Sequence, residues 1–537
     1  MPVQNLKPLI GLGLGGMAVA LLARPLFSWL FRVLPKLFGR QDPFGHNQLG
    51  FPQERKRLVS SCSLHLAARY TDRGKSRKSW INFVNPRRGV LILGSPGCGK
   101  TWFIIEPLIS QLLQKGYALF VYDYKFDSLS RYVYEEFLAN RRSGVKGVQF
   151  YCINFTDLRR THRCNVLEPA SLTHISDALG MARTVLLSIN KTWVNRQGDF
   201  FVESPINFLG AIIWYLKKYE GGKYCTLPHA IELAQYSYKE LFPILNSVSD
   251  IQALMKAFME AEEHRTFEML DGQIASARIP LGRLVSPDIY YVLTGDEVGL
   301  DINDRRAPKV FCLGGSAVRQ EALAPILSLF TDRLNRRINR EGGVPCGLVC
   351  DEFATVRAYT ITELVATARS NNIIPILSVQ DLNQLKTQYT HTEAETILNI
   401  AGNVICGQVG GDTARWLSER FPRIQQERVS TSENQQGSSE TRGQSWEPSM
   451  SPATIGTLSS GEFAGVVADE PGTELPIKVF HARIRPPKER TAHLPPLPLV
   501  RDLDEREVQE QFERVRKEVR ELVSYEKSRV AKEGGGS

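Results

Sequence analysis

The chain has 537 residues, of which 42% are hydrophobic and 23% are charged. These fractions are ordinary for globular proteins, so they exclude a wholly disordered chain, and the length allows two or three domains. The net charge of +9 is concentrated at the start, because the first 52 residues carry +4, residues 53–88 carry +8, and the remaining 449 carry −3. Most of the chain is therefore nearly neutral.

The nine cysteines occur singly, without a CxxC pair or a histidine spacing that would build a zinc site. They indicate a reduced compartment. Cys346 and Cys350 flank a short apolar run, and we interpret them as core residues rather than metal ligands.

An apolar run near the N-terminus, Leu9 to Phe31, is long enough to cross a bilayer and contains Arg24 as its single charge. Its charge-free part is shorter, so a signal peptide or an interfacial helix stays open. More positive charge follows the run than precedes it, which places the body on the cytoplasmic side. We predict a membrane anchor over residues 1–45 and a cytoplasmic body.

The basic stretch that follows, Arg55 to Arg88, has three interpretations. It could rest on anionic lipid, or meet DNA phosphates, or form the solvated face of a linker. Nothing in the sequence separates the three.

A phosphate-binding loop is predicted between a buried strand, Gly89 to Gly94, and a helical pattern over Trp102 to Leu113. Glycines let the backbone wrap around the β-phosphate, Lys100 would bridge the β- and γ-phosphates, and Thr101 would hold Mg²⁺. ATP with Mg²⁺ is the predicted ligand. The predicted contacts are Gly94, Ser95, Pro96, Gly97, Cys98, Gly99, Lys100 and Thr101.

A second strand, Tyr117 to Tyr122, ends in the charged segment YDYKFD. The carboxyl ends of parallel strands are where α/β sheets bind ligands, so Asp123 and Lys125 could lie near the nucleotide. They could equally just terminate the strand.

A second acidic strand end follows much later, where Gly347 to Cys350 precedes Asp351 and Glu352. This is the pattern of a Walker B strand, in which Asp351 would bind Mg²⁺ and Glu352 would polarise the attacking water. Further on, Arg369 could neutralise charge in a neighbouring subunit's site, and Gln380, after the strand Ile373 to Val379, could contact the γ-phosphate. A surface cation and a strand-end amide are the alternatives.

The segment DEFATVRAYTITELVATARSNNIIPILSVQDLNQL, followed by ILNIAGNVICGQVGGDTARWLSERF, closely resembles the TraG/TraD-type coupling proteins of bacterial conjugation and type IV secretion. The resemblance runs from about Gly89 to Arg483 and includes YDYKFD, RCNVLEP at 163–169 and GDFF at 198–201. Two features depart from the family pattern: a single clear span in the anchor, and Val166 where proline is common.

The resemblance implies an α/β fold, with a RecA-like motor domain, an inserted all-helical domain and an anchor in the bacterial inner membrane. It implies a homo-hexameric ATPase that delivers relaxase-bound, single-stranded DNA to the secretion channel and meets relaxosome proteins. The implied motor residues, in the roles given above, are Lys100, Thr101, Asp351, Glu352, Arg369 and Gln380.

About 220 residues separate the second strand from Walker B, more than a crossover needs, so an insertion is predicted over 172–295. Its patterns are helical over Ala178 to Ile189, Pro205 to Lys218, Tyr238 to Ile244 and Asp250 to Met269. The motor domain is then assigned to 46–171 and 296–490.

Within the second motor segment, the polar residues 423–452 are expected to be a flexible loop, because they offer little apolar surface to bury. Strands are expected within Phe463 to Arg483. In the tail, 491–537, Asp502 to Lys532 is predicted as an amphipathic helix, either a solvated appendage or a subunit contact.

Two rivals to a DNA-moving motor remain at this level. One is a translocase of the FtsK/HerA kind, against which the GGDTARWLSERF stretch and the polar loop argue. The other is a docking receptor for relaxosome or effector proteins, in which ATP holds the assembly together without driving transport.

Overall fold

The computed structural model describes residues 51–72, 74–142, 147–434, 437–487 and 494–534. The predicted anchor over residues 1–45 lies outside them. Within the described residues, no helix has the length and apolar character needed to cross a bilayer.

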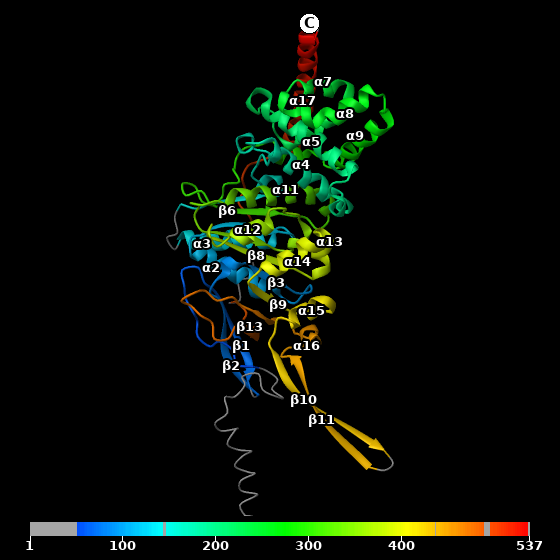
Figure 1. Ribbon diagram of the computed structural model, residues 1–537. Helices are drawn as coiled ribbons and strands as arrows, with labels where there is room; N and C mark the ends of the chain where they lie inside the picture. Colours follow the sequence, from blue (N-terminus) through cyan, green and yellow to red (C-terminus); the bar gives the residue numbers. More distant parts are fainter. Residues whose placement is uncertain (1–50, 73, 143–146, 435–436, 488–493, 535–537) are drawn as a thin grey trace, which may run out of the picture. The chain divides into compact units, whose positions relative to one another are not determined.

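An eleven-stranded sheet forms the centre of the fold, in the order β2-β1-β13-β12-β9-β3-β8-β7-β4-β6-β5 (Figure 1). Its strands from β9 to β5 are parallel, and β12, β13 and β1 continue the sheet in antiparallel pairing. The parallel strands are β3 (Val90–Leu93), β4 (Ala118–Asp123), β5 (Gln149–Ile153), β6 (Lys309–Gly314), β7 (Cys346–Cys350), β8 (Ile373–Val379) and β9 (Asn403–Cys406).

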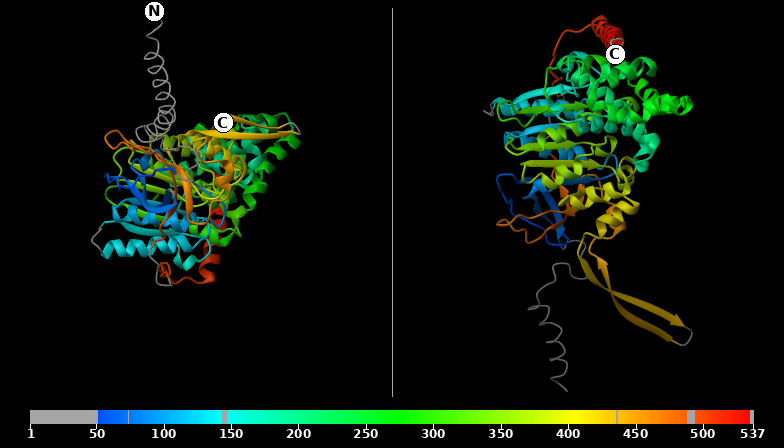
Figure 2. Two further views of the ribbon diagram at one scale, coloured as in Figure 1. Left: turned by 90° about the horizontal axis from the view of Figure 1, so that it is seen from below. Right: turned by 45° about the horizontal axis from the view of Figure 1, so that its top comes forward.

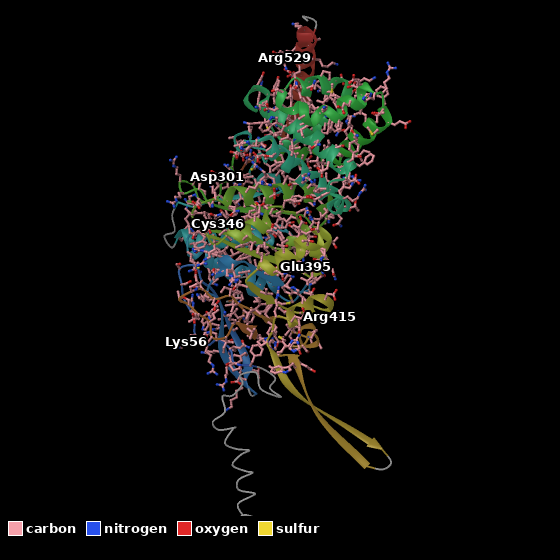
Figure 3. All side chains as sticks on the ribbon, viewed as in Figure 1. Lys56, Asp301, Cys346, Glu395, Arg415 and Arg529 are labelled. Carbon is pink, nitrogen blue, oxygen red and sulfur yellow. The ribbon has the colours of Figure 1, made fainter. Side chains whose placement is uncertain are left out.

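The central strands are buried on both faces, which fits their continuous apolar sequences. Every residue of β3, β4, β6, β7, β8 and β9 is buried. Helices α2 (Glu106–Gln114) and α3 (Ser128–Arg142) contribute to the same apolar core. All nine cysteines are buried and free, and Cys346 lies among the strands, as predicted (Figure 3).

The basic stretch Arg55 to Arg88 contains two strands of the sheet. Strands β1 (Leu64–Asp72) and β2 (Lys75–Phe83) close one edge, and β1 pairs with β13 (Val479–Ile484), which pairs with β12 (Glu462–Val466). The interpretation as a linker is therefore wrong. In β1 the exposed Arg69 lies between the buried Ala68 and Tyr70, and in β2 the basic residues precede a buried run that includes Ile81, so the apolar positions hold the edge in place.

A helical region joins β5 to β6 and gathers at one end of the sheet (Figures 1 and 2). Its helices are α4 (Ile175–Ile189), α5 (Phe200–Lys218), α6 (Leu227–Ala234), α7 (Tyr238–Asn246), α8 (Ser249–Glu263), α9 (Phe267–Gly282) and α10 (Pro287–Leu293). The single helix expected over Asp250 to Met269 is two helices. Arg265 adopts a left-handed conformation (φ 57°), which ends α8.

The C-terminal helix α17 (Glu505–Gly534) packs against α6, α7 and α10. Its buried face repeats at helical spacing, with Val515, Val519 and Leu522 at most 2% exposed. The Phe512 ring lies 4.9 Å from the ring of Tyr290 in α10. The predicted helix is confirmed. The interpretation as a solvated appendage is wrong, because the helix has mixed charges on its outer face and a buried apolar inner face.

Residues 423–452, expected to be a loop, contain a hairpin. Strands β10 (Arg423–Asn434) and β11 (Gly437–Pro448) pair in antiparallel register and form a sheet of their own. The prediction is wrong in its secondary structure. Paired strands satisfy each other's backbone groups, so a polar hairpin needs few apolar side chains to keep its register.

Candidate nucleotide site

The loop after β3 has the backbone of a phosphate-binding loop. Gly97 and Gly99 have φ values of 83° and 93°, a region that favours glycine. A Cβ added at Gly99 would lie 2.5 Å from the Phe103 ring, so the loop also needs glycine for space. The loop leads into a helical turn, η2 (Thr101–Ile105), and then α2, which places Thr101 at the start of a helix.

Lys100 is held between the loop and the Walker B strand end. Its Nζ donates a hydrogen bond to the Gly94 carbonyl (2.5 Å) and lies 3.8 Å from Glu352 Oε1. The lysine is 6% exposed. A buried ammonium group at this place can neutralise phosphate charge without first displacing a full hydration shell.

Asp351 and Glu352 follow β7, as predicted, and both are 7% exposed. Burial, together with the charges of Glu352 and Asp123, raises the pKa of Asp351 to about 7. Glu352 adopts a left-handed conformation, with φ 58° and ψ 54°. Its carbonyl accepts a hydrogen bond from Thr355 Oγ1 (2.7 Å), and that hydroxyl is 2.9 Å from the Tyr122 hydroxyl.

Asp123 and Lys125 both lie beside Walker B. Strands β4 and β7 pair Tyr122 with Cys350, so Asp123 and Asp351 follow adjacent strands at the same edge. Asp123 is 1% exposed, and burial raises its pKa to about 6. Lys125 is exposed, and its charge lowers the pKa of Asp351. The strand end is therefore part of the site's electrostatics.

Gln380 also reaches this edge. Strand β8 pairs with β3, with Val379 opposite Leu93, so Gln380 and Gly94 each follow their strand at neighbouring positions. Its Oε1 accepts a hydrogen bond from Gln384 Nε2 (3.1 Å).

Arg369 does not join the site of its own chain. It precedes β8 and so lies at the opposite edge of the sheet from the phosphate-binding loop. Its guanidinium group is 3.8 Å from Glu470, and the side chain is 61% exposed. Any contact between Arg369 and a nucleotide would have to be made in another subunit.

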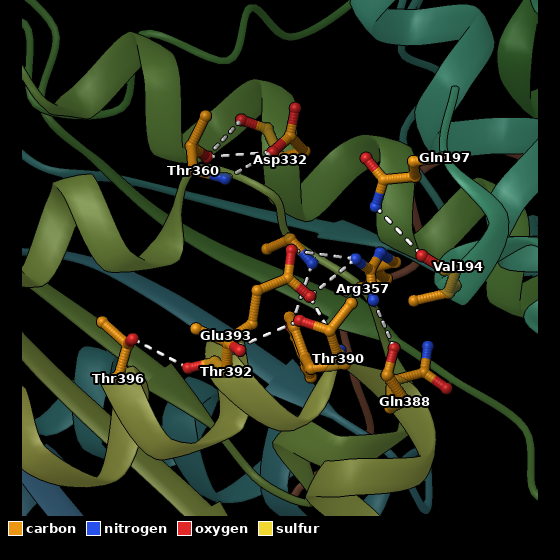
Figure 4. A network of polar contacts seen from close by, with 12 residues as sticks. Val194, Gln197, Asp332, Arg357, Thr360, Gln388, Thr390, Thr392, Glu393 and Thr396 are labelled. Carbon is orange, nitrogen blue, oxygen red and sulfur yellow. Dashed lines mark hydrogen bonds and ion pairs between the residues drawn. The ribbon is translucent and has the colours of Figure 1, made fainter. Parts of the chain in front are cut away.

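Sequence reasoning missed a buried arginine that supports the Walker B segment (Figure 4). Arg357 is fully buried and donates two hydrogen bonds to Glu393 (2.9 and 3.1 Å) and one to the Gln388 carbonyl (2.5 Å). It joins the segment after Glu352 to helices α13 (Leu382–Gln388) and α14 (His391–Ile400), which follow Gln380. No local pattern marks this residue.

A second support missed by sequence reasoning comes from the turn before β12. Gly461 N donates to the Cys98 carbonyl (3.2 Å), and Ser460 Oγ donates to the Gly97 carbonyl (3.3 Å). A Cβ added at Gly461 would lie 2.9 Å from Phe103. The turn therefore fixes the outer side of the phosphate-binding loop.

The oxygen atoms at the strand ends fit a hydrated Mg²⁺ ion. Asp351 Oδ1 and Asp123 Oδ1 are buried without a hydrogen-bond partner. Carboxylate oxygens are the ligands that Mg²⁺ accepts, often through its waters. No group of three or more His, Cys, Asp or Glu side chains in the described part of the chain could hold a metal by itself.

A segment in the second half of the chain matches a protein family. Residues 345–460 match the family described as "TraM recognition site of TraD and TraG". This segment begins at Walker B and contains Arg369, Gln380 and the turn at Ser460. This part of the chain is therefore similar to the TraD and TraG proteins.

Solved structures of one bacterial conjugative coupling protein share the fold. The unbound conjugative coupling protein TrwB is 16% identical with a TM-score of 0.56, over 77% of this chain and 88% of TrwB. TrwB with ADP and Mg²⁺ gives the same identity and TM-score, over 76% and 87%. TrwB with a GTP analogue is 15% identical with a TM-score of 0.56, over 86% and 99%. No curated protein matches the chain by sequence.

Proposed function

We propose that this chain is a membrane-anchored ATPase that recruits relaxase-bound DNA and moves it to a type IV secretion channel. One observation carries the enzymatic part: Lys100 lies between the phosphate-binding loop and Glu352, with Asp351 beside it. The fold supports the choice of ligand, because one of the TrwB structures that share it is a complex with ADP and Mg²⁺.

In the proposed mechanism, backbone N–H groups from Gly94 to Thr101 bind the β-phosphate, and Lys100 moves from the Gly94 carbonyl to the phosphates. Mg²⁺, when bound, would neutralise charge between the β- and γ-phosphates, with Thr101 and Asp351 as its protein partners. Glu352 polarises the attacking water, and Gln380 contacts the γ-phosphate.

Arg369 completes the site from a neighbouring subunit. It lies at the opposite edge of its own sheet and is largely exposed, as a residue that acts across an interface must be. We therefore propose a homo-hexameric ring with arginine fingers in trans. Residues 1–45 would anchor this ring in the bacterial inner membrane, with the body in the cytoplasm.

DNA would be bound mostly through its phosphates at the centre of the ring, and this binding would be sensitive to salt. The near-neutral net charge of residues 89–537 argues against a strongly basic lining throughout, so a few basic residues per subunit would have to gather at the centre of the ring. Relaxosome proteins are the proposed partners of the cytoplasmic body.

The docking receptor stays as a second candidate, because the matching family is described by a TraM recognition site. In that version residues 345–460 bind a relaxosome protein, and ATP stabilises the assembly without steady turnover. The FtsK/HerA alternative has no comparable observation in its favour.

ATP hydrolysis by the full-length chain, purified in detergent, tests the proposal. Single-stranded and double-stranded DNA are added separately, and Lys100→Ala and Arg369→Ala are compared with Arg415→Ala, an arginine whose side chain is 72% exposed. The expected result is turnover that rises with DNA and with protein concentration and is lost in the first two variants. Nucleotide binding without DNA-dependent turnover would instead favour the docking receptor.

A further inference from the structure

Two buried carboxylates stand side by side where β4 and β7 end. Their strands are hydrogen-bonded neighbours, with Tyr122 opposite Cys350, and Asp123 and Asp351 are the next residues. Asp123 is 1% exposed and Asp351 is 7% exposed. Two negative charges on neighbouring strand ends repel each other unless a cation or a shared hydrogen-bond donor lies between them.

One carboxylate oxygen of Asp123 accepts hydrogen bonds, and the other has no donor. Its Oδ2 accepts hydrogen bonds from the backbone N–H and the hydroxyl of Ser130, both at 2.8 Å. Its Oδ1 is buried and has no partner, and the same is true of Asp351 Oδ1. The two bonds to Ser130 hold the carboxylate in one orientation, so the free oxygen is preorganised.

Free buried carboxylate oxygens are costly, because they have lost water without gaining a donor. The waters of a hydrated divalent cation are donors of the required kind, and the neighbouring phosphate-binding loop is where such an ion would bind with its nucleotide. The Lys125 side chain is exposed and the Lys100 ammonium group bonds to the Gly94 carbonyl, so neither lysine side chain donates a hydrogen bond to these two oxygens.

We propose that Asp123 is a positioning residue for the Mg²⁺ of the nucleotide site, accepting hydrogen bonds from the ion's coordinated waters together with Asp351. The proposal rests on the proposed nucleotide site. It gives the YDYKFD segment a function beyond ending a strand, and it makes Ser130, on α3, part of the support for the metal. Its competitor is a purely structural Asp123 that caps the start of α3.

The test measures metal binding separately from turnover. Affinity for a fluorescent ADP is determined for the full-length chain in excess Mg²⁺ and in EDTA, and Mn²⁺ binding to the ADP complex is followed by electron paramagnetic resonance. The variant is Asp123→Asn, which keeps an oxygen to accept the Ser130 bonds. The matched control is Asp127→Asn, whose side chain is 42% exposed and 4.0 Å from Arg131.

Asp123→Asn is expected to weaken Mn²⁺ binding to the complex about tenfold, the loss typical of an outer-shell partner. ADP affinity in EDTA is expected to stay unchanged, and Asp127→Asn to behave like the unmodified chain. If Asp123→Asn does not fold, Ser130→Ala is the second variant, because it removes one of the two bonds that orient Asp123, and a smaller loss is expected.

Equal Mn²⁺ affinity in the folded Asp123→Asn variant, or in Ser130→Ala if that is the one that folds, would overturn the proposal and leave Asp123 as a helix cap. Failure of the proposed function has a different signature. In that case DNA-stimulated turnover is absent in the unmodified chain, whatever the metal dependence of ADP binding.

Discussion

Glu352 combines two properties that are each unusual for a glutamate. It is buried, and its backbone is left-handed, a conformation that costs a non-glycine residue roughly 1–3 kcal/mol. Thr355 and Tyr122 hold this conformation from one side, and the bonds of Arg357 hold the following segment from the other. Such strain is maintained where a side chain must be aimed, which fits a residue that orients an attacking water.

Replacing this carboxylate tests its chemical role. In Glu352→Gln we expect the turnover number for ATP to fall by about 10²–10⁴-fold, the usual contribution of a general base. The affinity for ATP is expected to stay within a small factor, because the amide keeps the size of the side chain. Steady-state kinetics and equilibrium binding check this. Glu395→Gln, with a side chain 53% exposed, is the control, and unchanged turnover in Glu352→Gln would contradict the assignment.

At the scale of elements, the two edges of the fold are stabilised differently. At the β1 edge a polar network is buried, in which His65 Nδ1 is 3.1 Å from Asn82 Oδ1 and His65 Nε2 is 3.1 Å from Ser63 Oγ. At the C-terminus, α17 buries an apolar face against the helical region. Acid should therefore destabilise the β1 edge, and removal of apolar side-chain volume should destabilise the packing of α17.

Burial lowers the pKa of His65 below its ordinary value. The unfolded chain then binds a proton more readily than the folded chain, so the stability due to neutral His65 is lost as the pH falls below about 6.5. In His65→Gln, urea unfolding should change less between pH 7 and pH 5 than in the unmodified chain. His391→Gln, with a side chain 67% exposed, is the control, and equal pH dependence in His65→Gln would refute this.

Leu522 is 2% exposed in the buried face of α17. Leu522→Ala should lower the free energy of unfolding by about 2–5 kcal/mol, because it removes apolar contacts and leaves a cavity. Glu521→Ala, next to it with a side chain 63% exposed, should have little effect. Denaturant unfolding measures both. A Leu522→Ala variant as stable as Glu521→Ala would mean that α17 does not pack as described.

For the whole molecule, the sheet separates the proposed catalytic groups. Lys100, Glu352 and Gln380 lie at the carboxyl edge of the parallel strands, and Arg369 lies at the amino edge. If Arg369 acts on a nucleotide, as we propose, a complete site needs two copies of the chain. ATP turnover should therefore depend on the association of subunits, and each site should combine residues from two of them.

Mixing two inactive variants tests this division. Arg369→Ala and Glu352→Gln should each be inactive alone. Mixed and reassembled, they should regain part of the activity, since some interfaces combine Glu352 of one subunit with Arg369 of the next. ATP turnover of the mixture, compared with either variant alone at the same total concentration, checks this. No recovery under conditions where subunits exchange would contradict a finger in trans.

The sequence by itself determined the parts whose signal is local. The phosphate-binding loop, Walker B and the helices of the inserted region each follow from patterns a few turns long, because backbone geometry and burial periodicity act over neighbouring residues. The same patterns placed Gln380 at a strand end. These patterns could not predict that Gln380 lies beside Gly94, because the sequence of a single strand does not specify which strands are its neighbours.

Only the tertiary structure decided which distant residues meet. It brought Asp123 beside Asp351, buried Arg357 against Glu393, and packed α17 onto the helical region. It also placed Arg369 away from its own site and paired the polar hairpin β10–β11. These outcomes depend on the strand order and on partners far along the chain. Periodicity shows that a face is buried, but not which surface buries it.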